Sequence, residues 1–363
     1  MPLPGHRPVA VIGHAVLLYD DPLDLADRLA ATGAGGGRLA LACDPAHAAV
    51  LAARLGGPVL RRLARPDIHT RPAAALAACH RLTRPDHGPH RTNPEADPEA
   101  DADAGREADP KLGGPVVAVL EPEPGTKDED WARAARFEAA LDLTVPGSGL
   151  TAVCTYPARI PEPLLGYVLA THPFLLTRAG RALNPGHVDP AGLLGDLGPH
   201  RPTAAPPGEP RLHLDGSSTL RDLEPIRRRV VAALDDVATL VRTDFVAAVN
   251  EILTNAFLHG RPPVELTLWA GEGAVECRIT DRGDGRPDPT AGYRPRPSPT
   301  RAGAGLWLAR QACDDLDMWR TDDGLTVRAA TATDRPRQHA GAIARAETAR
   351  SRADLFTRRA SVH

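Results

Sequence analysis

The feature that most constrains this chain is a set of three short motifs, rich in polar residues and glycine, that follow one another between Asp244 and Thr326. In chain order they are Glu251-Ile-Leu-Thr-Asn-Ala-Phe-Leu-His-Gly260, Asp281-Arg-Gly-Asp-Gly285 and Gly303-Ala-Gly-Leu306. The sequence around them predicts a long helix for the first, a strand end for the second and a helix start for the third. A fold for this region must bring these three places together.

The first motif falls on a predicted helix from about Thr243 to Leu258. Glu251, Asn255 and His259 recur at intervals of four, so they share one side of this helix. A separate face is apolar and predicts contact with a core; it is formed by Phe245, Val249, Ile252, Leu253 and Ala256. A polar stripe is usually a solvated face, but one that holds an Asn among apolar neighbours and ends in His-Gly favours a site.

The rest of this region predicts a hairpin, a helix and a closing strand, over 264–269, 274–280, 306–313 and 324–329. The hairpin's second strand runs directly into Asp281. Residues 286–302 are rich in Pro, Arg and Gly, and predict a mobile loop before the last motif.

On these motifs, residues 213–331 resemble the ATPase domains of the gyrase, Hsp90, histidine kinase and MutL superfamily, and above all the anti-sigma serine kinases of bacterial partner switching. The three motifs match the N box and two glycine boxes, and Gly324-Leu-Thr326 weakly matches a third. The resemblance implies an α+β two-layer Bergerat (GHKL) fold that binds ATP with Mg²⁺.

The resemblance and the chemistry of the side chains give each polar residue an expected role. Asn255 would hold Mg²⁺, because an amide oxygen is a hard neutral ligand. Glu251, one turn earlier, would act as the general base. Asp281 would accept a hydrogen bond from the adenine amino group. The other expected ATP contacts are His259, Gly260, Gly283, Gly285, Arg301, Gly303, Gly305, Leu306 and Thr326.

Three of these contacts have a stated chemistry. Gly303 and Gly305 would offer amide N–H groups to phosphate at a helix N-terminus. Thr326 would support the adenine through its hydroxyl. Arg301 would contact the γ-phosphate, with an exposed loop arginine as the alternative.

The N-terminal half alternates short apolar strands with helices, which predicts an α/β layer on a parallel sheet. The strands are expected at 16–19, 38–43, 115–120 and 151–156, and the helices at 22–30, 46–55, 131–141 and 164–170. A P-loop needs a Lys after its glycines. The glycine loop 33–37 lacks one, so a helix C-cap and turn is the preferred interpretation.

Scattered residues of this half resemble the sensory domain called MEDS: His14 with Tyr19, Trp131 with Arg136-Phe-Glu138, Cys154-Thr-Tyr156 and Thr171-His-Pro173. The resemblance implies a RecA-like α/β fold without nucleotide motifs, and a sensory role for an unknown ligand. His14, Tyr156 and His172 are candidates to line its pocket. The alternative is that both histidines are ordinary core or turn residues.

The expected organisation has four parts. They are a sensory domain over 1–197 with a disordered insertion at 84–114, a Pro-rich linker at 198–212, an ATP-binding domain over 213–331 and a disordered basic tail over 332–363.

Composition narrows the class of partner. The net charge of −3 offers no basic field for nucleic acid. Five separated cysteines form no C-x-x-C pair, and no stretch approaches the ~20 apolar residues that span a bilayer. We therefore expect a cytoplasmic protein with reduced thiols, no membrane contact and a possible homodimer.

By resemblance, the protein binds a sigma factor and phosphorylates a serine of a STAS-type anti-sigma antagonist, as a serine/threonine kinase under sensory control. One alternative is a non-catalytic module in which ATP only shapes the sigma-factor surface. Another is an orphan ATPase like a histidine kinase. The helix expected at 223–234 carries no His followed by an acid, which argues against a phosphoacceptor helix.

Overall fold

The computed structural model describes residues 13–32, 38–56, 59–62, 75–76, 79, 116–122, 128–197, 205–217, 219–271, 273–294 and 305–333. The predicted insertion at 84–114 and the glycine loop 33–37 lie outside these residues, as does the predicted tail from 334 onwards. Contacts divide the chain into two compact units. Unit 1 comprises Met1–His69 and Ala75–Pro190, and unit 2 comprises Thr70–Ala74 and Ala191–His363.

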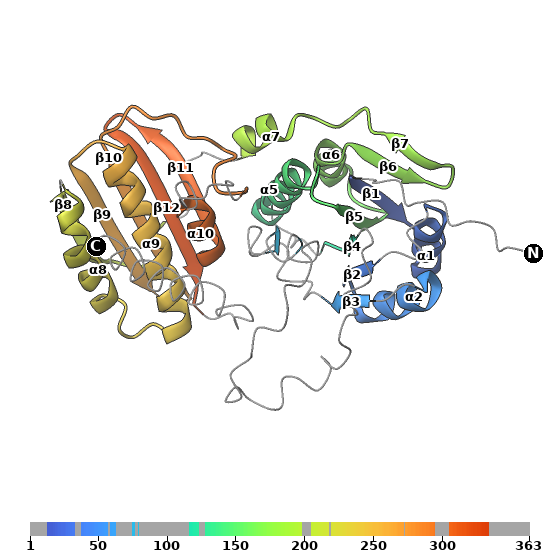
Figure 1. The fold of residues 1–363 in the computed structure, drawn as a ribbon, viewed down its shortest axis with the longest axis horizontal. Helices are drawn as coiled ribbons and strands as arrows, with labels where there is room; N and C mark the ends of the chain where they lie inside the picture. The colour runs from blue at the N-terminus through green and yellow to red at the C-terminus, as the bar shows by residue number, and fades with distance from the viewer. Residues whose placement is uncertain are drawn as a thin grey trace, which may run out of the picture. The chain divides into compact units, whose positions relative to one another are not determined.

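Unit 1 is built on a seven-stranded mixed sheet with the order β3-β2-β4-β5-β1-β6-β7 (Figure 1). Neighbouring strands pair in parallel except β6 and β7, which form an antiparallel hairpin. The strands are β1 (His14–Tyr19), β2 (Arg38–Ala42), β3 (Val59–Arg62), β4 (Val116–Leu120), β5 (Leu150–Pro157), β6 (Phe174–Thr177) and β7 (Gly180–Leu183).

Four helices of unit 1 begin within three residues of their predicted starts. They are α1 (Pro22–Ala31), α2 (Pro45–Leu55), α5 (Asp128–Thr144) and α6 (Glu162–Thr171). The side chain of Asp21 accepts hydrogen bonds from the first-turn amides of α1, and Asp44 caps α2 in the same way. The predicted alternation of strands and helices is therefore confirmed, while β3 and the β6–β7 hairpin were not predicted.

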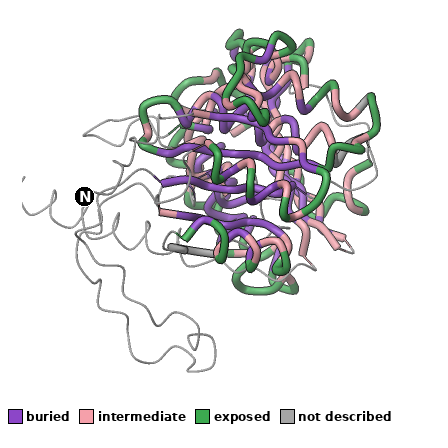
Figure 2. Tube along the Cα trace, turned by 90° about the vertical axis from the view of Figure 1, so that its right-hand side faces the viewer, coloured by how far each residue is buried: buried purple, intermediate pink, exposed green. Residues whose placement is uncertain are grey.

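The central strands β1, β2, β4 and β5 are buried on both faces, as expected when helices cover a parallel sheet (Figure 2). The β6–β7 hairpin at one edge is more exposed. Ala15 and Leu17 of β1 pack into one core with residues of α1 and α2. His14 and Val16 alternate with them along the strand, so they point to the opposite face.

Unit 2 contains a five-stranded antiparallel sheet with the order β11-β12-β10-β9-β8, and its helices lie on one face of this sheet (Figure 1). The strands are β8 (Pro210–Ser217), β9 (Val264–Gly271), β10 (Ala274–Asp281), β11 (Asp315–Thr321) and β12 (Gly324–Ala332). The helices are α8 (Leu223–Ala232), α9 (Thr239–His259) and α10 (Gly305–Ala312), with a 3-10 turn, η1 (Leu220–Asp222), before α8. A further helix, α7 (Pro190–Leu197), begins at the boundary between the units.

The core of unit 2 lies between the helices and one face of the sheet. Buried and half-buried residues alternate along β9, which confirms the predicted hairpin. The central helix α9 begins at Thr239, four residues before the predicted start. Strand β8 begins at Pro210, inside the segment predicted as linker, and β11 was not predicted.

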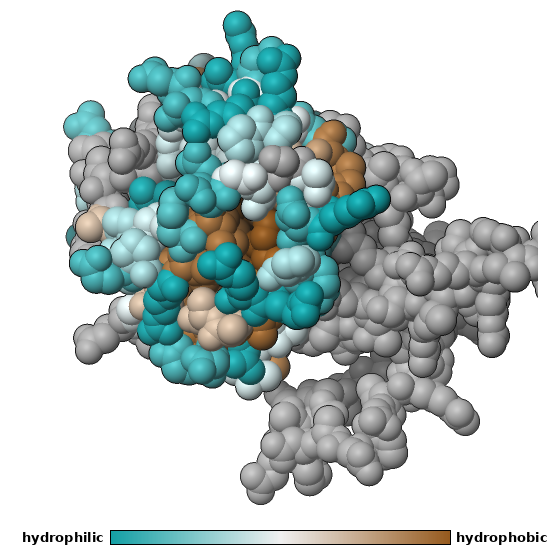
Figure 3. Space-filling model, turned by 90° about the vertical axis from the view of Figure 1, so that its left-hand side faces the viewer, coloured by the Kyte–Doolittle hydropathy of each residue, from teal (hydrophilic) through white to brown (hydrophobic). Residues whose placement is uncertain are grey.

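The described surface of unit 2 is mostly hydrophilic, with a group of apolar side chains in the face that Figure 3 shows. Among the described residues of this unit, the exposed large apolar ones are Leu220, Val231, Leu240 and Leu258. Among the described helices, none combines the length and apolar character needed to cross a membrane.

Candidate functional site

A cavity of about 400 Å³ in unit 2 collects most of the residues singled out by the motifs. Its lining comes from α9, from the end of β10, the middle of β11 and the start of β12, from the segment after β10 and from the start of α10. The long helix, the strand end and the helix start meet here as the sequence requires.

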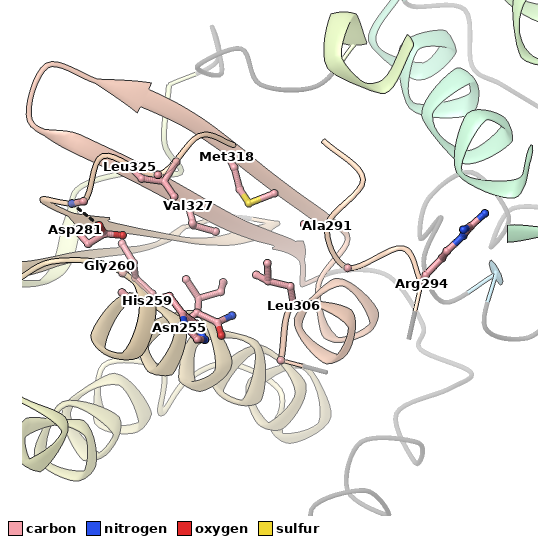
Figure 4. Close-up of a pocket in the computed structure, with 17 residues that line it drawn as sticks. Asn255, His259, Gly260, Asp281, Ala291, Arg294, Leu306, Met318, Leu325 and Val327 are labelled. Atoms are coloured by element: carbon pink, nitrogen blue, oxygen red, sulfur yellow. Dashed lines mark hydrogen bonds between the residues drawn. The ribbon is translucent and has the colours of Figure 1, made fainter. Parts of the chain in front are cut away.

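Much of the cavity wall is apolar. Met318, Leu325 and Val327 reach it from the sheet, and Leu306 faces them from α10 (Figure 4). Ile252 of α9 adds a further apolar contact. A space bounded in this way by aliphatic side chains suits a flat, weakly polar ring.

The carboxylate of Asp281 is the fixed polar group at one end of the cavity. Asp281 is buried at the end of β10, and its Oδ1 accepts hydrogen bonds from the backbone N–H of Gly283 at 2.7 Å and of Arg261 at 3.3 Å. A Cβ on Gly260 would overlap the carboxyl carbon of Asp281, and one on Gly283 would lie 2.6 Å from Oδ1. Both glycines are therefore required by close approach to this carboxylate.

The opposite end of the cavity brings Asn255 and Glu251 against the start of α10. A Cβ on Gly305 would lie 2.9 Å from Glu251 Oε2 and 3.3 Å from Asn255 Nδ2. Asn255 is half-buried and lines the cavity. Glu251 is buried and does not belong to the lining residues.

The structure brings together eight of the predicted ATP contacts as lining residues. They are Asn255, His259, Gly260, Asp281, Gly283, Gly285, Gly305 and Leu306. Two others, Arg301 and Gly303, lie outside the described residues.

The predicted contact between Thr326 and the adenine is corrected by the structure. Leu325 and Val327 line the cavity, so Thr326 between them points to the other face of the sheet. There its hydroxyl lies 2.9 Å from the hydroxyl of Thr280, its partner across β10 and β12. Thr326 therefore contributes to the sheet rather than to the cavity.

Two arginines that the motifs did not indicate hold the cavity wall in place. Arg320 of β11 donates hydrogen bonds from Nη1 to the carbonyl oxygens of Gly283 at 2.7 Å and Gly285 at 3.2 Å. Arg310 of α10 donates from Nε to the carbonyl oxygen of Ala291 at 2.7 Å. No sequence pattern indicated Arg320, because β11, the strand that carries it, was not predicted.

Arg294 also belongs to the lining residues, but its side chain points away from the other labelled ones (Figure 4). It ends the described segment before residues 295–304. The sequence indicated only a Pro-, Arg- and Gly-rich loop here, so nothing separated Arg294 from its neighbours.

In unit 1, the three pocket candidates lie together in the interior. The ring centroids of His14 and His172 are 4.2 Å apart, and those of Tyr156 and His172 are 6.5 Å apart. All three side chains are buried. Burial and the neighbouring His172 lower the pKa of His14 to about 3, so its imidazole is neutral.

Comparison with known proteins identifies one part of the chain. Residues 216–331 match the family model of the histidine kinase-like ATPase domain, so the chain contains a domain of this kind. No curated protein matches the chain. A crystal structure of the RsbU and RsbW domains of Rv1364c from Mycobacterium tuberculosis matches at 21% identity and a TM-score of 0.27, covering 36% of this chain and 34% of that chain. The match therefore spans about a third of that chain's length.

Proposed function

We propose that unit 2 binds Mg²⁺-ATP in the cavity and acts as an anti-sigma regulator that phosphorylates a serine of a STAS-type antagonist and binds a sigma factor. The observation that carries the nucleotide part is the buried Asp281 carboxylate, held by the Gly283 amide at 2.7 Å beside an apolar wall. The match of residues 216–331 to a histidine kinase-like ATPase domain supports the same assignment.

Asp281 gives the cavity a preference for adenine. Both backbone donors bond to Oδ1, so Oδ2 keeps its capacity to accept a hydrogen bond. The exocyclic amino group of adenine can donate to it, whereas guanine carries a carbonyl oxygen at that position. The aliphatic side chains of Met318, Leu325 and Val327 would then lie against the base.

The other end of the cavity fits the phosphates and Mg²⁺. A Cβ at Gly305 would lie 3.3 Å from the Asn255 amide nitrogen and 2.9 Å from Glu251 Oε2, so the glycine leaves space beside Asn255, which lines the cavity. Bound Mg²⁺ would neutralise phosphate charge. Asn255 would hold the ion through its amide oxygen, and Glu251 would accept the proton of the attacking serine hydroxyl.

A second function, a binding module without phosphotransfer, is favoured by the position of Glu251. Its side chain is buried and lies outside the set of lining residues. In such a module ATP would only shape the surface that meets the sigma factor.

Unit 1 would supply the sensory control. Its α/β sheet, parallel except for one hairpin, and its buried His14, Tyr156 and His172 support a RecA-like fold related to MEDS domains. The ligand would act from within the cytoplasm.

The nucleotide assignment is tested by calorimetric titration of ATP and GTP with Mg²⁺. Asp281→Asn should weaken ATP binding by roughly 2–3 kcal/mol, about 30- to 150-fold, because it removes a charged acceptor. Asp284→Asn is the matched control, since that side chain is 83% exposed and should leave affinity unchanged. Equal ATP affinity in the two variants would show that the site is assigned wrongly.

Phosphotransfer is tested separately with labelled ATP and STAS-type proteins encoded nearby. Serine phosphate that disappears in Glu251→Ala while ATP binding survives supports the kinase. ATP binding without transfer to any of these proteins supports the module.

A further inference from the structure

The interior of unit 1 holds three metal-ligating side chains that the nucleotide site does not use. They are His14 at the start of β1, Cys154 in β5 and His172 directly after α6. All three are at most 1% exposed, and one ligand atom from each lies within 4.8 Å of the others. Two imidazoles and a thiol form the donor set that Zn²⁺ and other borderline or soft metal ions prefer.

The sheet itself brings the first two ligands together. In the parallel pair of β1 and β5, Val16 lies opposite Cys154 and His14 lies opposite Ala152. Alternate residues share a face, so His14 and Cys154 point to the same side of the sheet. This side is opposite to the one that α1 and α2 cover.

His172 presents an unpartnered nitrogen to this group. Its Nδ1 lies 2.7 Å from the carbonyl oxygen of Val168, so Nδ1 carries the proton and donates it. In a ring that donates from Nδ1, Nε2 is the nitrogen available to a metal ion. Among the described residues Nε2 has no hydrogen-bond partner, although the side chain is completely buried. A buried acceptor without a partner is rare in folded proteins, and an ion would satisfy it.

The separation of His14 and Cys154 suits ligation of one ion by both. His14 Nε2 and Cys154 Sγ are 3.5 Å apart. Two ligands at the usual Zn–N and Zn–S distances and a tetrahedral angle are separated by about 3.5 Å.

Carboxylates behind the ligands supply the charge and orientation that such sites need. Asp142 Oδ1 lies 3.7 Å from His14 Nδ1, and its Oδ2 lies 2.9 Å from Nε2 of His187. Glu138, one turn earlier on α5, lies 3.7 Å from His172 Nδ1. A carboxylate behind a ligating histidine fixes its ring and raises its basicity, and negative groups offset the charge of a buried cation.

We propose that His14, Cys154 and His172 bind a single transition-metal ion, with Zn²⁺ as the expected species. Each histidine ligates through Nε2, and the Cys154 thiol releases its proton to solvent as the Sγ–metal bond forms. Three protein ligands leave a fourth tetrahedral position that a small exogenous donor can take. The site lies outside the nucleotide cavity and stands or falls independently of the proposed function of unit 2.

The test is a Co²⁺ and Zn²⁺ titration of the full-length chain after chelator treatment. We expect saturation at one equivalent of Co²⁺, visible d–d bands, a near-ultraviolet thiolate-to-cobalt band, and displacement by Zn²⁺. Cys154→Ser and His172→Asn should weaken binding at least about 100-fold. Cys277→Ser, which alters a buried thiol of unit 2, should change neither bands nor affinity.

Circular dichroism of each variant checks that it folds. If the cluster variants do not fold, X-ray absorption of the zinc-loaded unaltered chain decides the question, because one sulfur and two imidazole nitrogens are expected around the ion. Failure to saturate at one equivalent, a shell of oxygen and nitrogen alone, or thiolate bands that persist in Cys154→Ser would overturn the proposal.

Discussion

The cavity of unit 2 and the buried cluster of His14, Cys154 and His172 in unit 1 differ in how their polar groups are hydrogen-bonded. In the cavity, the Asp281 carboxylate is held by two backbone N–H donors. In the cluster, His14 Nδ1 and His172 Nε2 have no hydrogen-bond partner among the described residues. The Asp281 carboxylate is thus held in position by the protein itself, whereas the cluster contains two buried nitrogens without hydrogen-bond partners among the described residues.

The difference follows from access to water. Polar groups around an open cavity can be hydrated, so the protein needs only to hold them in position. Glycines permit the close contacts that do this. A sealed group cannot be hydrated, and an unsatisfied buried acceptor costs about 1–3 kcal/mol. The cavity should therefore be sensitive to added Cβ atoms, and the cluster to the loss of ligand atoms.

The largest expected effect is that of Gly324→Ala, which should affect unit 2 and not unit 1. Gly324 has φ +152°, and a Cβ there would overlap the carbonyl oxygen of Asp281. We expect the free energy of unfolding of unit 2 to fall by about 3 kcal/mol. Gly216→Ala is the control, because φ is +74° but nothing lies within 4 Å, so only about 1–2 kcal/mol should be lost.

Denaturant unfolding monitored by circular dichroism measures both variants. Metal binding at the unit 1 cluster should survive in Gly324→Ala. Equal destabilisation by the two substitutions would show that backbone strain, and not contact with Asp281, explains the glycine.

The next effect concerns nucleotide affinity. The new Cβ of Gly260→Ala would overlap the carboxyl carbon of Asp281 and lie 2.6 Å from the backbone oxygen of Ala256, so it would displace the carboxylate and strain the end of α9. We expect ATP binding to weaken by about 2 kcal/mol, roughly 30-fold. Gly166→Ala, in α6 of unit 1, places its Cβ in open space, so affinity measured by calorimetry should change less than about threefold. If Gly260→Ala binds ATP normally, the position of the Asp281 carboxylate does not determine ATP affinity.

How far the sequence alone could predict this arrangement depended on the range of the interactions. Glu251, Asn255 and His259 share a helix face by local periodicity, and α1 begins at Pro22, as predicted from its local sequence. Such features are decided within a few residues of the chain. They were predicted, and the structure contains them.

Features that depend on strand pairing were not predictable in the same way. Thr326 was assigned to the nucleotide, but strand alternation turns it to the other face, and a shift of one residue is enough to reverse that outcome. Strand β11 alternates acidic with apolar residues, and Asp317 is paired with Arg328 on the neighbouring strand. Strand propensity depends on such non-local neighbours.

The cluster of unit 1 shows the same limit more strongly. The sequence singled out His14 and His172 as pocket candidates, but it placed Cys154 only in a segment that resembles the MEDS domain and did not name it as a pocket residue. The parallel pairing of β1 with β5 and β6 is what brings all three together. A donor set spread over three elements leaves no spacing pattern to find.

Arg320 tests whether the cavity is anchored by side chains as well as by glycines. Arg320→Ala removes two hydrogen bonds to the carbonyls of Gly283 and Gly285. We expect ATP affinity to fall by about 1–1.5 kcal/mol, close to tenfold. Arg261→Ala removes only an exposed ion pair at 3.5 Å and keeps the backbone N–H that bonds Asp281, so affinity should stay within about twofold. Calorimetric titration distinguishes them, and similar losses in both would point to general charge rather than anchoring.

The smallest expected effect on nucleotide binding is that of Thr326→Val, which tests whether Thr326 lies outside the cavity. The hydroxyl pairs with that of Thr280 on the face away from the lining residues. Its loss should lower the free energy of unfolding by about 1 kcal/mol, while ATP affinity stays within about twofold. Thr280→Val should give the same result, and the double variant should cost less than the sum of the two, because both partners of one hydrogen bond are then apolar. A tenfold loss of ATP affinity in Thr326→Val alone would restore Thr326 to the nucleotide site and show that the sheet face was assigned wrongly.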